Sequence, residues 1–260
     1  MNNRILRNID IVLMVIFPVV AAVIATIFKT NFFISNLLFL GVPSLYIILR
    51  KPAIIKKCLL FGIAFSIPLG IAVDYIGVMS SAWSVPQTLF NRFLGVVFWE
   101  DVMWGFLWGF FAISFYEYFW DQPTRRDLIS KNLKYLLFIA YIILIIILIF
   151  NSLSPELLNI RYYFIGGGII VLLLPIFILW HLFPKPREHI FKTAIYFLGV
   201  MLLYELVGVS QKLWIFPSKN YVGFFELFGV RFPIEEFLFA IIFGTTWLLV
   251  NYEFFIDDRR

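Results

Sequence analysis

Long apolar runs separated by short polar segments dominate the chain. A membrane-spanning helix needs about 20 mostly apolar residues. Eight such stretches can be delimited, at about 9–28, 32–49, 58–79, 93–119, 135–150, 161–183, 193–210 and 230–255. Open sheets cannot span lipid, and the two-residue alternation of a membrane barrel is missing from these runs. The pattern therefore predicts an all-α fold, a polytopic membrane helical bundle of about eight transmembrane helices.

Composition supports lipid as the surrounding solvent. Of the 260 residues, 62% are hydrophobic and 14% are charged, whereas soluble domains average roughly 45–50% apolar and about 25% charged residues. This excludes a soluble globular enzyme and a disordered chain. The 32 Phe, 12 Tyr and 8 Trp exceed what lipid contact requires, which suggests a large apolar or polyene ligand, or a cation to be stabilised.

Other counts narrow the chemistry. The single Cys58 excludes an intrachain disulfide and a Cys-rich metal or iron–sulfur site, and we expect neither a metal nor a cofactor. The net charge of +5 is spread without a dense basic run, so nucleic-acid binding is not expected.

The loop charges predict the orientation in the membrane. Cytoplasmic loops carry an excess of Lys and Arg. If the N-terminus is cytoplasmic, six of the 21 Lys and Arg fall outside, namely Lys29, Arg92, Arg161, Lys212, Lys219 and Arg231, and the other fifteen fall inside. This asymmetry predicts an integral protein of the cytoplasmic membrane with both termini cytoplasmic.

The sequence repeats itself. An acidic residue, Gly, Trp and Pro recur 131 residues apart, as Asp74, Gly77, Trp83 and Pro86 against Glu205, Gly208, Trp214 and Pro217. Two further matches follow, at offsets of 135 and 136: Glu100–Asp101 with Glu235–Glu236, and Tyr116–Glu117 with Tyr252–Glu253. We expect two four-helix repeats, 1–126 and 127–260. An even number of spans in each makes them parallel, related by an axis along the membrane normal.

Six acids of the repeat fall within apolar runs, toward the outer side of the membrane: Asp74, Glu100, Asp101, Glu205, Glu235 and Glu236. Each acid at the bilayer centre costs about 2.5–3.5 kcal/mol on insertion scales. Adjacent residues of a helix point in different directions, so one member of each pair can face a cavity while the other braces a neighbour. By contrast, we expect Glu117 and Glu253 to be solvated acids at the ends of their helices.

These acids have a structural and a chemical interpretation. They could pair with Arg92, Arg231 or loop amides to fix the bundle. Their duplication at matched positions, with few basic partners, favours chemistry. Clustered carboxyl groups in an apolar site can hold a protonated acid beside a carboxylate, and such a pair could protonate and then deprotonate an apolar substrate.

The residues around the second acidic pair resemble a known family. Trp214-x-x-Pro217, followed by Pro233-Ile-Glu-Glu-Phe-Leu-Phe239, is similar to the lycopene cyclase domain. This small, integral-membrane, flavin-independent family occurs as paired polypeptides or as tandem fusions. The first half keeps Glu100–Asp101 but has Phe98 where the second has Pro233, which leaves open whether both halves are equally competent.

The resemblance implies lycopene β-cyclisation without net redox change. A carboxyl group protonates the terminal C1=C2 bond, the C5=C6 bond closes the ring, and a carboxylate removes a proton from C6. The implied catalytic residues are Glu235 and Glu236 as the central pair, Glu100 and Asp101 as their partners, and Asp74 and Glu205 as supporting acids. Trp83, Trp214, Trp99 and Trp104 would bind the substrate and shield its cation.

The implied partners are lycopene or another acyclic carotenoid, membrane lipid and other enzymes of carotenoid synthesis. Alternatives stay open at this point. The same proton chemistry could yield ε or γ rings, a cyclised C50 carotenoid or a hydrated end group. Intramembrane acids in parallel repeats also suit a proton-coupled transporter or a membrane scaffold, although transporter sites usually lie at the midplane.

Overall fold

A computed structural model describes residues 3–120, 129–182 and 186–257, with side chains from Leu6 onward. The predicted boundary between the halves, at 126/127, lies outside these residues. So do Arg125, Arg126, Lys185, Arg259, Arg260 and the side chain of Arg4, which contribute to the charge asymmetry.

Helices form most of the described chain, and four of the membrane-length segments include a π-helical stretch. The first half contains α1 (Asn3–Phe28), α2 (Phe32–Asn36), η1 (Leu37–Gly41), α3 (Val42–Arg50), η2 (Pro52–Ile54), α4 (Ile55–Phe61), η3 (Gly62–Ser66), α5 (Ile67–Met79) and α6 (Trp99–Phe119). The second contains α7 (Leu133–Leu153), η4 (Pro155–Leu158), α8 (Tyr163–Gly167), η5 (Gly168–Leu173), α9 (Leu174–Leu182), α10 (Arg187–Ser210), α11 (Ile234–Glu236), η6 (Phe237–Phe243) and α12 (Gly244–Phe255).

Seven helical segments of the described chain are long and apolar enough to cross a membrane. They confirm a helical membrane bundle and match seven of the eight predicted spans. The eighth, α6, is long enough to span a membrane, at 21 residues, but does not meet the composition requirement that the other seven meet. Its second half is almost continuously buried, because it runs through the centre of the molecule.

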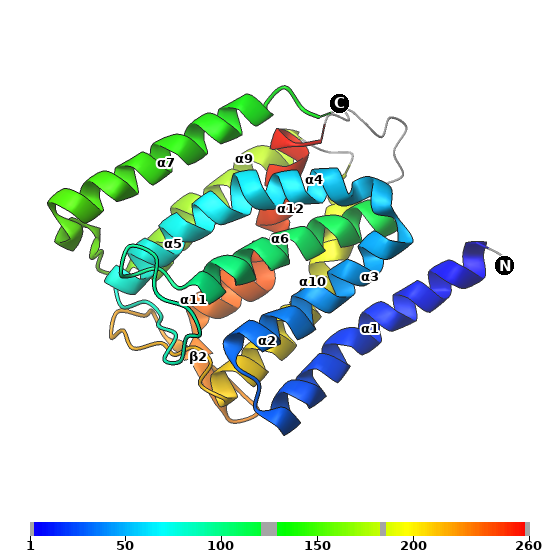
Figure 1. The fold of residues 1–260 in the computed structure, drawn as a ribbon, viewed down its shortest axis with the longest axis horizontal. Coiled ribbons are helices and arrows are strands. Elements are labelled where there is room, and N and C mark those ends of the chain that lie inside the picture. Colours follow the sequence, from blue (N-terminus) through cyan, green and yellow to red (C-terminus); the bar gives the residue numbers. More distant parts are fainter. Residues whose placement is uncertain (1–2, 121–128, 183–185, 258–260) are drawn as a thin grey trace.

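Figure 1 shows α6 in the interior, with α1 and α7 at opposite margins. Helix α5 packs against α6 and α7, and α10 packs against α12 and α1. The beginning of α1 and the end of α12 lie toward the same end of the bundle in Figure 1, and the long connections 80–98 and 211–233 lie toward the other.

The prediction of an all-α fold needs one correction. Strands β1 (Phe224–Leu227) and β2 (Val230–Pro233) form an antiparallel hairpin before α11. Its turn places Phe228 and Gly229 at φ values of 52° and 77°, and two consecutive positive φ values match the twist of a tight hairpin. The first half has a similar turn at Leu94–Gly95, with φ values of 53° and 74°, where Phe93 bridges Val97.

The two long connections are tied together by their main chains. Ser84 N–H donates to Ile215 O at 2.9 Å, and Ile215 N–H donates to Ser84 O at 2.8 Å. These two residues are themselves 131 positions apart. In addition, the Tyr221 hydroxyl donates to Ala82 O at 2.7 Å, and burial raises the pKa of Tyr221 to about 12, so this hydroxyl stays a donor at neutral pH.

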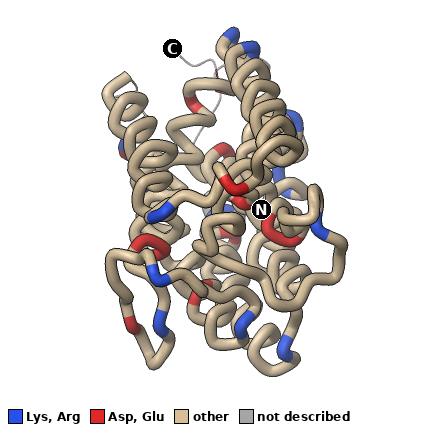
Figure 2. Tube along the Cα trace, turned by 90° about the vertical axis from the view of Figure 1, so that its left-hand side faces the viewer, with Lys and Arg blue, Asp and Glu red and all other residues tan. Residues whose placement is uncertain are grey.

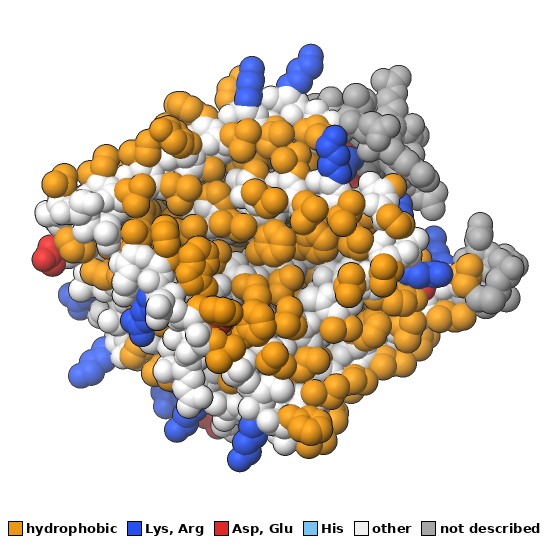
Figure 3. Space-filling model, in the orientation of Figure 1, with side chains coloured by type: hydrophobic (Ala, Val, Ile, Leu, Met, Phe, Trp, Pro, Cys, Tyr) orange, Lys and Arg blue, Asp and Glu red, His pale blue; other side chains and the backbone are white. Residues whose placement is uncertain are grey.

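The outer surface suits contact with lipid. Figure 3 shows a broad apolar face with Lys and Arg side chains toward its margins. Figure 2 shows most Lys and Arg residues toward the periphery of the molecule, whereas several Asp and Glu residues lie nearer its centre. Many large apolar side chains are exposed, such as Phe138 (63%) and Ile170 (65%), which water would disfavour and hydrocarbon accepts.

Candidate functional site

A cavity of about 220 Å³ lies beneath the two tied connections. Four of the six predicted acids line it: Asp74 from α5, Asp101 from α6, Glu205 from α10 and Glu236 from α11. Two come from each half of the chain. The rest of the wall is mainly apolar and aromatic, so these carboxyl groups meet in surroundings that solvate charge poorly.

The other two acids do not line this cavity. Glu100 Oε1 accepts the backbone N–H groups of Leu89 at 2.5 Å and Phe90 at 3.3 Å. In the same way, Glu235 Oε1 accepts Val222 N–H at 2.6 Å. Both side chains are buried, at 1% exposure. They hold the connections that cover the cavity, as carboxylates that accept backbone N–H groups commonly do.

Each adjacent pair is therefore divided between two tasks. Because a helix turns by about 100° per residue, Asp101 and Glu236 face the cavity when Glu100 and Glu235 face the connections. One member faces a cavity and the other braces its surroundings, as expected. The expected central pairing of Glu235 with Glu236 does not describe this geometry, since only Glu236 of that pair lines the cavity.

Tryptophans hold the supporting acids. Trp83 Nε1–H lies between two carboxylates, donating to Asp74 Oδ1 at 2.9 Å and to Asp101 Oδ2 at 3.0 Å. At the matched position, Trp214 Nε1–H donates to Glu205 Oε1 at 3.2 Å. The recurrence of Asp or Glu with Trp nine residues later thus has a direct physical cause.

The repeated glycines make room for these indoles. A Cβ atom on Gly77 would lie 2.2 Å from the ring of Trp83, and one on Gly208 would lie 1.9 Å from the ring of Trp214. Both are closer than any side chain tolerates. Each glycine therefore lets an indole lie against the helix that carries the supporting acid.

The four lining acids differ in their bonding. Asp74 is the most constrained, because its Oδ2 also accepts Phe98 N–H at 2.8 Å. Over the ranges 3–120, 129–182 and 186–257, no hydrogen bond to the carboxylate of Glu236 is found. Among the four, Glu236 is therefore the carboxyl group least committed to the protein.

The nearby arginines do not form ion pairs with these acids among the described residues. The Arg92 guanidinium lies 4.4 Å from the ring centre of Phe98, and that of Arg231 lies 4.3 Å from the ring centre of Phe224. The alternative in which these two cations neutralise the acids is thus not the observed arrangement. Loop amides and indoles satisfy several of the acids instead.

The aromatic wall agrees in part with the predicted substrate contacts. Trp83, Trp214 and Trp104 line the cavity, whereas Trp99 does not; it is 41% exposed and packs on Phe93 with ring centres 5.4 Å apart. Trp108, next to Trp104 at 4.9 Å, lines it without having been predicted. The spacing of Asp101, Trp104 and Trp108 on one helical face was the available signal.

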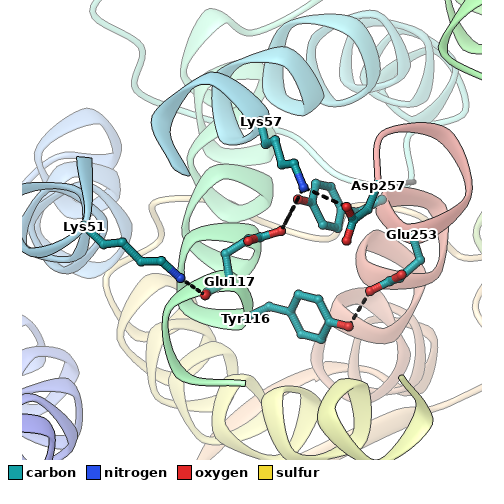
Figure 4. A network of polar contacts seen from close by, with 7 residues as sticks. Lys51, Lys57, Tyr116, Glu117, Glu253 and Asp257 are labelled. Carbon is teal, nitrogen blue, oxygen red and sulfur yellow. Dashed lines mark hydrogen bonds and ion pairs between the residues drawn. The ribbon is translucent and has the colours of Figure 1, made fainter. Parts of the chain in front are cut away.

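A second polar cluster lies at the opposite ends of α6 and α12 (Figure 4). Lys57 Nζ lies 2.7 Å from Asp257 Oδ1 and 3.8 Å from Glu117 Oε1. The Tyr116 hydroxyl donates to Glu253, and the Tyr252 hydroxyl donates to Glu117. Glu117 and Glu253 are only 1% and 7% exposed, so the prediction that they are solvated was wrong.

No protein-family model, curated protein or solved structure matches this chain. In the described residues there is also no group of three or more His, Cys, Asp or Glu side chains arranged to hold a metal ion. The cavity and its four carboxyl groups must therefore support any inference about function.

Proposed function

We propose that this protein is a cofactor-independent carotenoid cyclase that converts the acyclic ends of lycopene into β-ionone rings. One observation carries the proposal. Two carboxyl groups from each half of the chain, Asp74 and Asp101 with Glu205 and Glu236, line one apolar cavity with an aromatic wall. An uncharged polyene fits such a cavity, and proton transfer is the chemistry that carboxyl groups provide there.

Asp101 is the proposed proton donor. Its carboxyl group shares the Trp83 N–H with Asp74, and two like charges this close in an apolar site repel each other, so the pair is most stable when it holds one proton. That proton adds to C2 of the substrate, and the cation forms at C1. The C5=C6 electrons then form the C1–C6 bond and move the cation to C5.

Glu236 is the proposed proton acceptor. It faces the cavity without a hydrogen bond from the described residues, and it removes a proton from C6 to form the C5=C6 bond. One proton enters and one leaves, so no redox partner is needed. Asp74 and Glu205 act as positioning residues through the two indoles.

The aromatic wall stabilises the intermediate cation. Trp83, Trp104 and Trp214 present electron-rich rings to the cavity, and each well-placed ring contributes about 0.5–2 kcal/mol to a nearby cation. Exclusion of water by the apolar wall also protects the cation from capture. The product depends on how the cation is neutralised. Loss of a proton from C6 gives a β ring, loss of a proton from another carbon gives another ring type, and capture of water gives a hydrated end group.

We further propose that the chain consists of two parallel four-helix repeats, 1–126 and 127–260, related by a pseudo-two-fold axis. Reciprocal contacts support this. Tyr116 bonds to Glu253 while Tyr252 bonds to Glu117, and α5 packs on α7 as α10 packs on α1. Such exchange of equivalent partners characterises a two-fold interface. The two halves then share one cavity rather than each forming its own.

The proposed location is the cytoplasmic membrane, with both termini on the cytoplasmic side. The excess of Lys and Arg in the connections on that side supports this orientation. Lycopene is formed and held in lipid, so the membrane and the other enzymes of carotenoid synthesis are the expected surroundings of the protein.

The test is pigment analysis after expression in cells that accumulate lycopene. Formation of β-carotene, or of a product with one ring, supports the cyclase. Products with ε rings or a hydroxylated end would keep the proton chemistry and change the quenching step. Unchanged lycopene beside abundant, membrane-inserted protein would refute the proposal.

A further inference from the structure

A second cavity opens beside the first. Its volume is about 370 Å³, and it lies between η3 and α5, α7, η5 and α9, and α12. Four residues line both cavities, namely Phe65, Leu69, Val171 and Trp247, so the second cavity adjoins the acid-lined one. Its lining is apolar apart from Asn251, whose side-chain amide donates to Trp247 O at 2.8 Å.

Two of the helical segments around this second cavity, which we call the groove, are the least buried of the seven apolar spans. In the apolar window of span 163–182 only 6% of residues are buried, and in that of 133–153 only 17%, against 50% for span 32–50. Two groove residues, Ile139 and Ile178, are 44% and 51% exposed. The groove therefore opens toward the lipid-facing side of the bundle.

The matching region of the first half is filled. At an offset of 136, Trp247 corresponds to Phe111 and Asn251 to Phe115. Phe115 stacks on Tyr196 with ring centres 4.2 Å apart, and Phe111 packs on Phe197 at 4.8 Å. Phe111 and Phe115 are 0% and 6% exposed. The molecule thus has a groove on one side and a packed aromatic cluster on the other.

We propose that the groove is the lateral entrance of the site and binds the unreacted length of the polyene. One end of the substrate lies among the carboxyl groups while its chain extends through the groove into lipid. The identity of this ligand rests on the proposed function. The acid cavity alone is smaller than the roughly 300–1,000 Å³ of typical ligand pockets, so a long molecule needs the adjoining space.

An entrance on this side of the bundle has a chemical consequence. Only one end of the substrate reaches the acids at a time. A product with two rings requires release, reversal and a second entry, in which the ring already formed lies in the groove. The groove therefore controls the ratio of one-ring to two-ring product.

The test introduces larger side chains into the groove at a position on α7. Ala140 lines it, whereas Ile146 on the same helix is 43% exposed and lies outside it. In lycopene-accumulating cells we expect Ala140→Trp to lower ring formation at least tenfold and Ile146→Trp to leave it unchanged, at equal membrane levels. The smaller Ala140→Leu should raise the proportion of one-ring product.

A binding measurement separates this inference from the proposed function. The double variant Asp101→Asn/Glu236→Gln, purified in lipid nanodiscs with lycopene, should retain pigment, and adding Ala140→Trp should release most of it. Full ring formation and full pigment retention in the Ala140→Trp background would overturn the proposal that the groove is the entrance. Absence of ring formation by the unaltered protein would instead refute the cyclase. Pigment retention that is lost equally with Ile146→Trp would indicate general lipid-like adsorption and also overturn the entrance.

Discussion

The protein has two clusters of buried or half-buried carboxyl groups, one beside each end of α6. From Asp101 to Glu117 along α6 the helical rise is about 24 Å. At one end, four acids line a cavity, and three of them, Asp74, Asp101 and Glu205, accept indole or backbone N–H groups. At the other, Glu117, Glu253 and Asp257 are joined to Lys57 and to two tyrosines (Figure 4).

The two clusters differ in how their carboxyl groups are compensated by neighbouring groups. The Lys57 cluster compensates its charges by an ion pair and reciprocal hydroxyl bonds, and it connects α6, α12 and α4. The acid-lined cavity instead keeps carboxyl groups facing a mainly apolar and aromatic wall. A buried charge with good partners holds helices together, whereas a carboxyl group that faces a cavity can act on whatever enters it.

Removing the cavity acids should have the largest effect on activity. We expect Asp101→Asn or Glu236→Gln to lower the rate of ring formation by roughly 10²–10⁴-fold, the usual contribution of general acid or base catalysis. Membrane insertion and thermal stability should be little changed, because both replacements preserve shape. Ring formation can be followed by pigment analysis relative to the protein present in membranes.

The neighbouring acids provide matched controls for this result. Glu235→Gln keeps an oxygen that can accept Val222 N–H and should retain most of the activity, and so should Glu226→Gln on the exposed hairpin. If Glu235→Gln abolishes ring formation while Glu236→Gln does not, the assignment of the two faces of α11 is reversed.

Removing the cation should break the second cluster. Lys57→Met removes the ion pairs that Lys57 makes with Asp257 and Glu117, and loss of one member of a buried pair costs about 3–5 kcal/mol. The apparent thermal midpoint in detergent should fall strongly. Lys56→Met, at the exposed adjacent position, should leave it nearly unchanged. Equal midpoints for the two variants would mean that the cluster contributes little to stability.

A change behind the indole should have a smaller, mixed effect. In Gly208→Ala the new Cβ displaces Trp214, and such overpacking costs roughly 1–3 kcal/mol. Ring formation should fall as well, because the indole no longer holds Glu205. Gly199 on the same helix has open space beside it, so Gly199→Ala should stabilise by up to about 1 kcal/mol. A parallel response of both variants would contradict the packing role of Gly208.

The membrane spans followed from a sequence pattern with a direct physical cause, whereas the sequence left open whether the acids of the two halves form one site or two. Apolar length is dictated by bilayer thickness, and the spacing of Asp74, Gly77 and Trp83 recurred because an indole must reach a carboxyl group past a glycine. The sequence pattern places Asp101 and Glu236 on helices, but which side of each helix faces the cavity depends on the surrounding helices. For α6, the helical spacing of Asp101, Trp104 and Trp108 on one side of the helix was the signal of this direction.

Other features depended on contacts that a linear pattern does not contain. Glu117 and Glu253 are buried because each accepts a hydrogen bond from the tyrosine that precedes the other in sequence. In addition, Lys57 of α4 lies beside Glu117. The exposure of Trp99 likewise follows from the path of the connection before α6. The short hairpin was hidden because Phe228–Gly229 lies in a segment rich in apolar residues.

The paired bonds between Ser84 and Ile215 have an evolutionary consequence. They join main-chain atoms alone, so substitution of either side chain leaves them intact. A contact of this kind preserves the alignment of two sequence-related connections while their side chains diverge, and a serine can face an isoleucine 131 positions away. Side chains elsewhere in the two halves can then diverge toward an open cavity on one side and a packed aromatic cluster on the other, without loss of this contact.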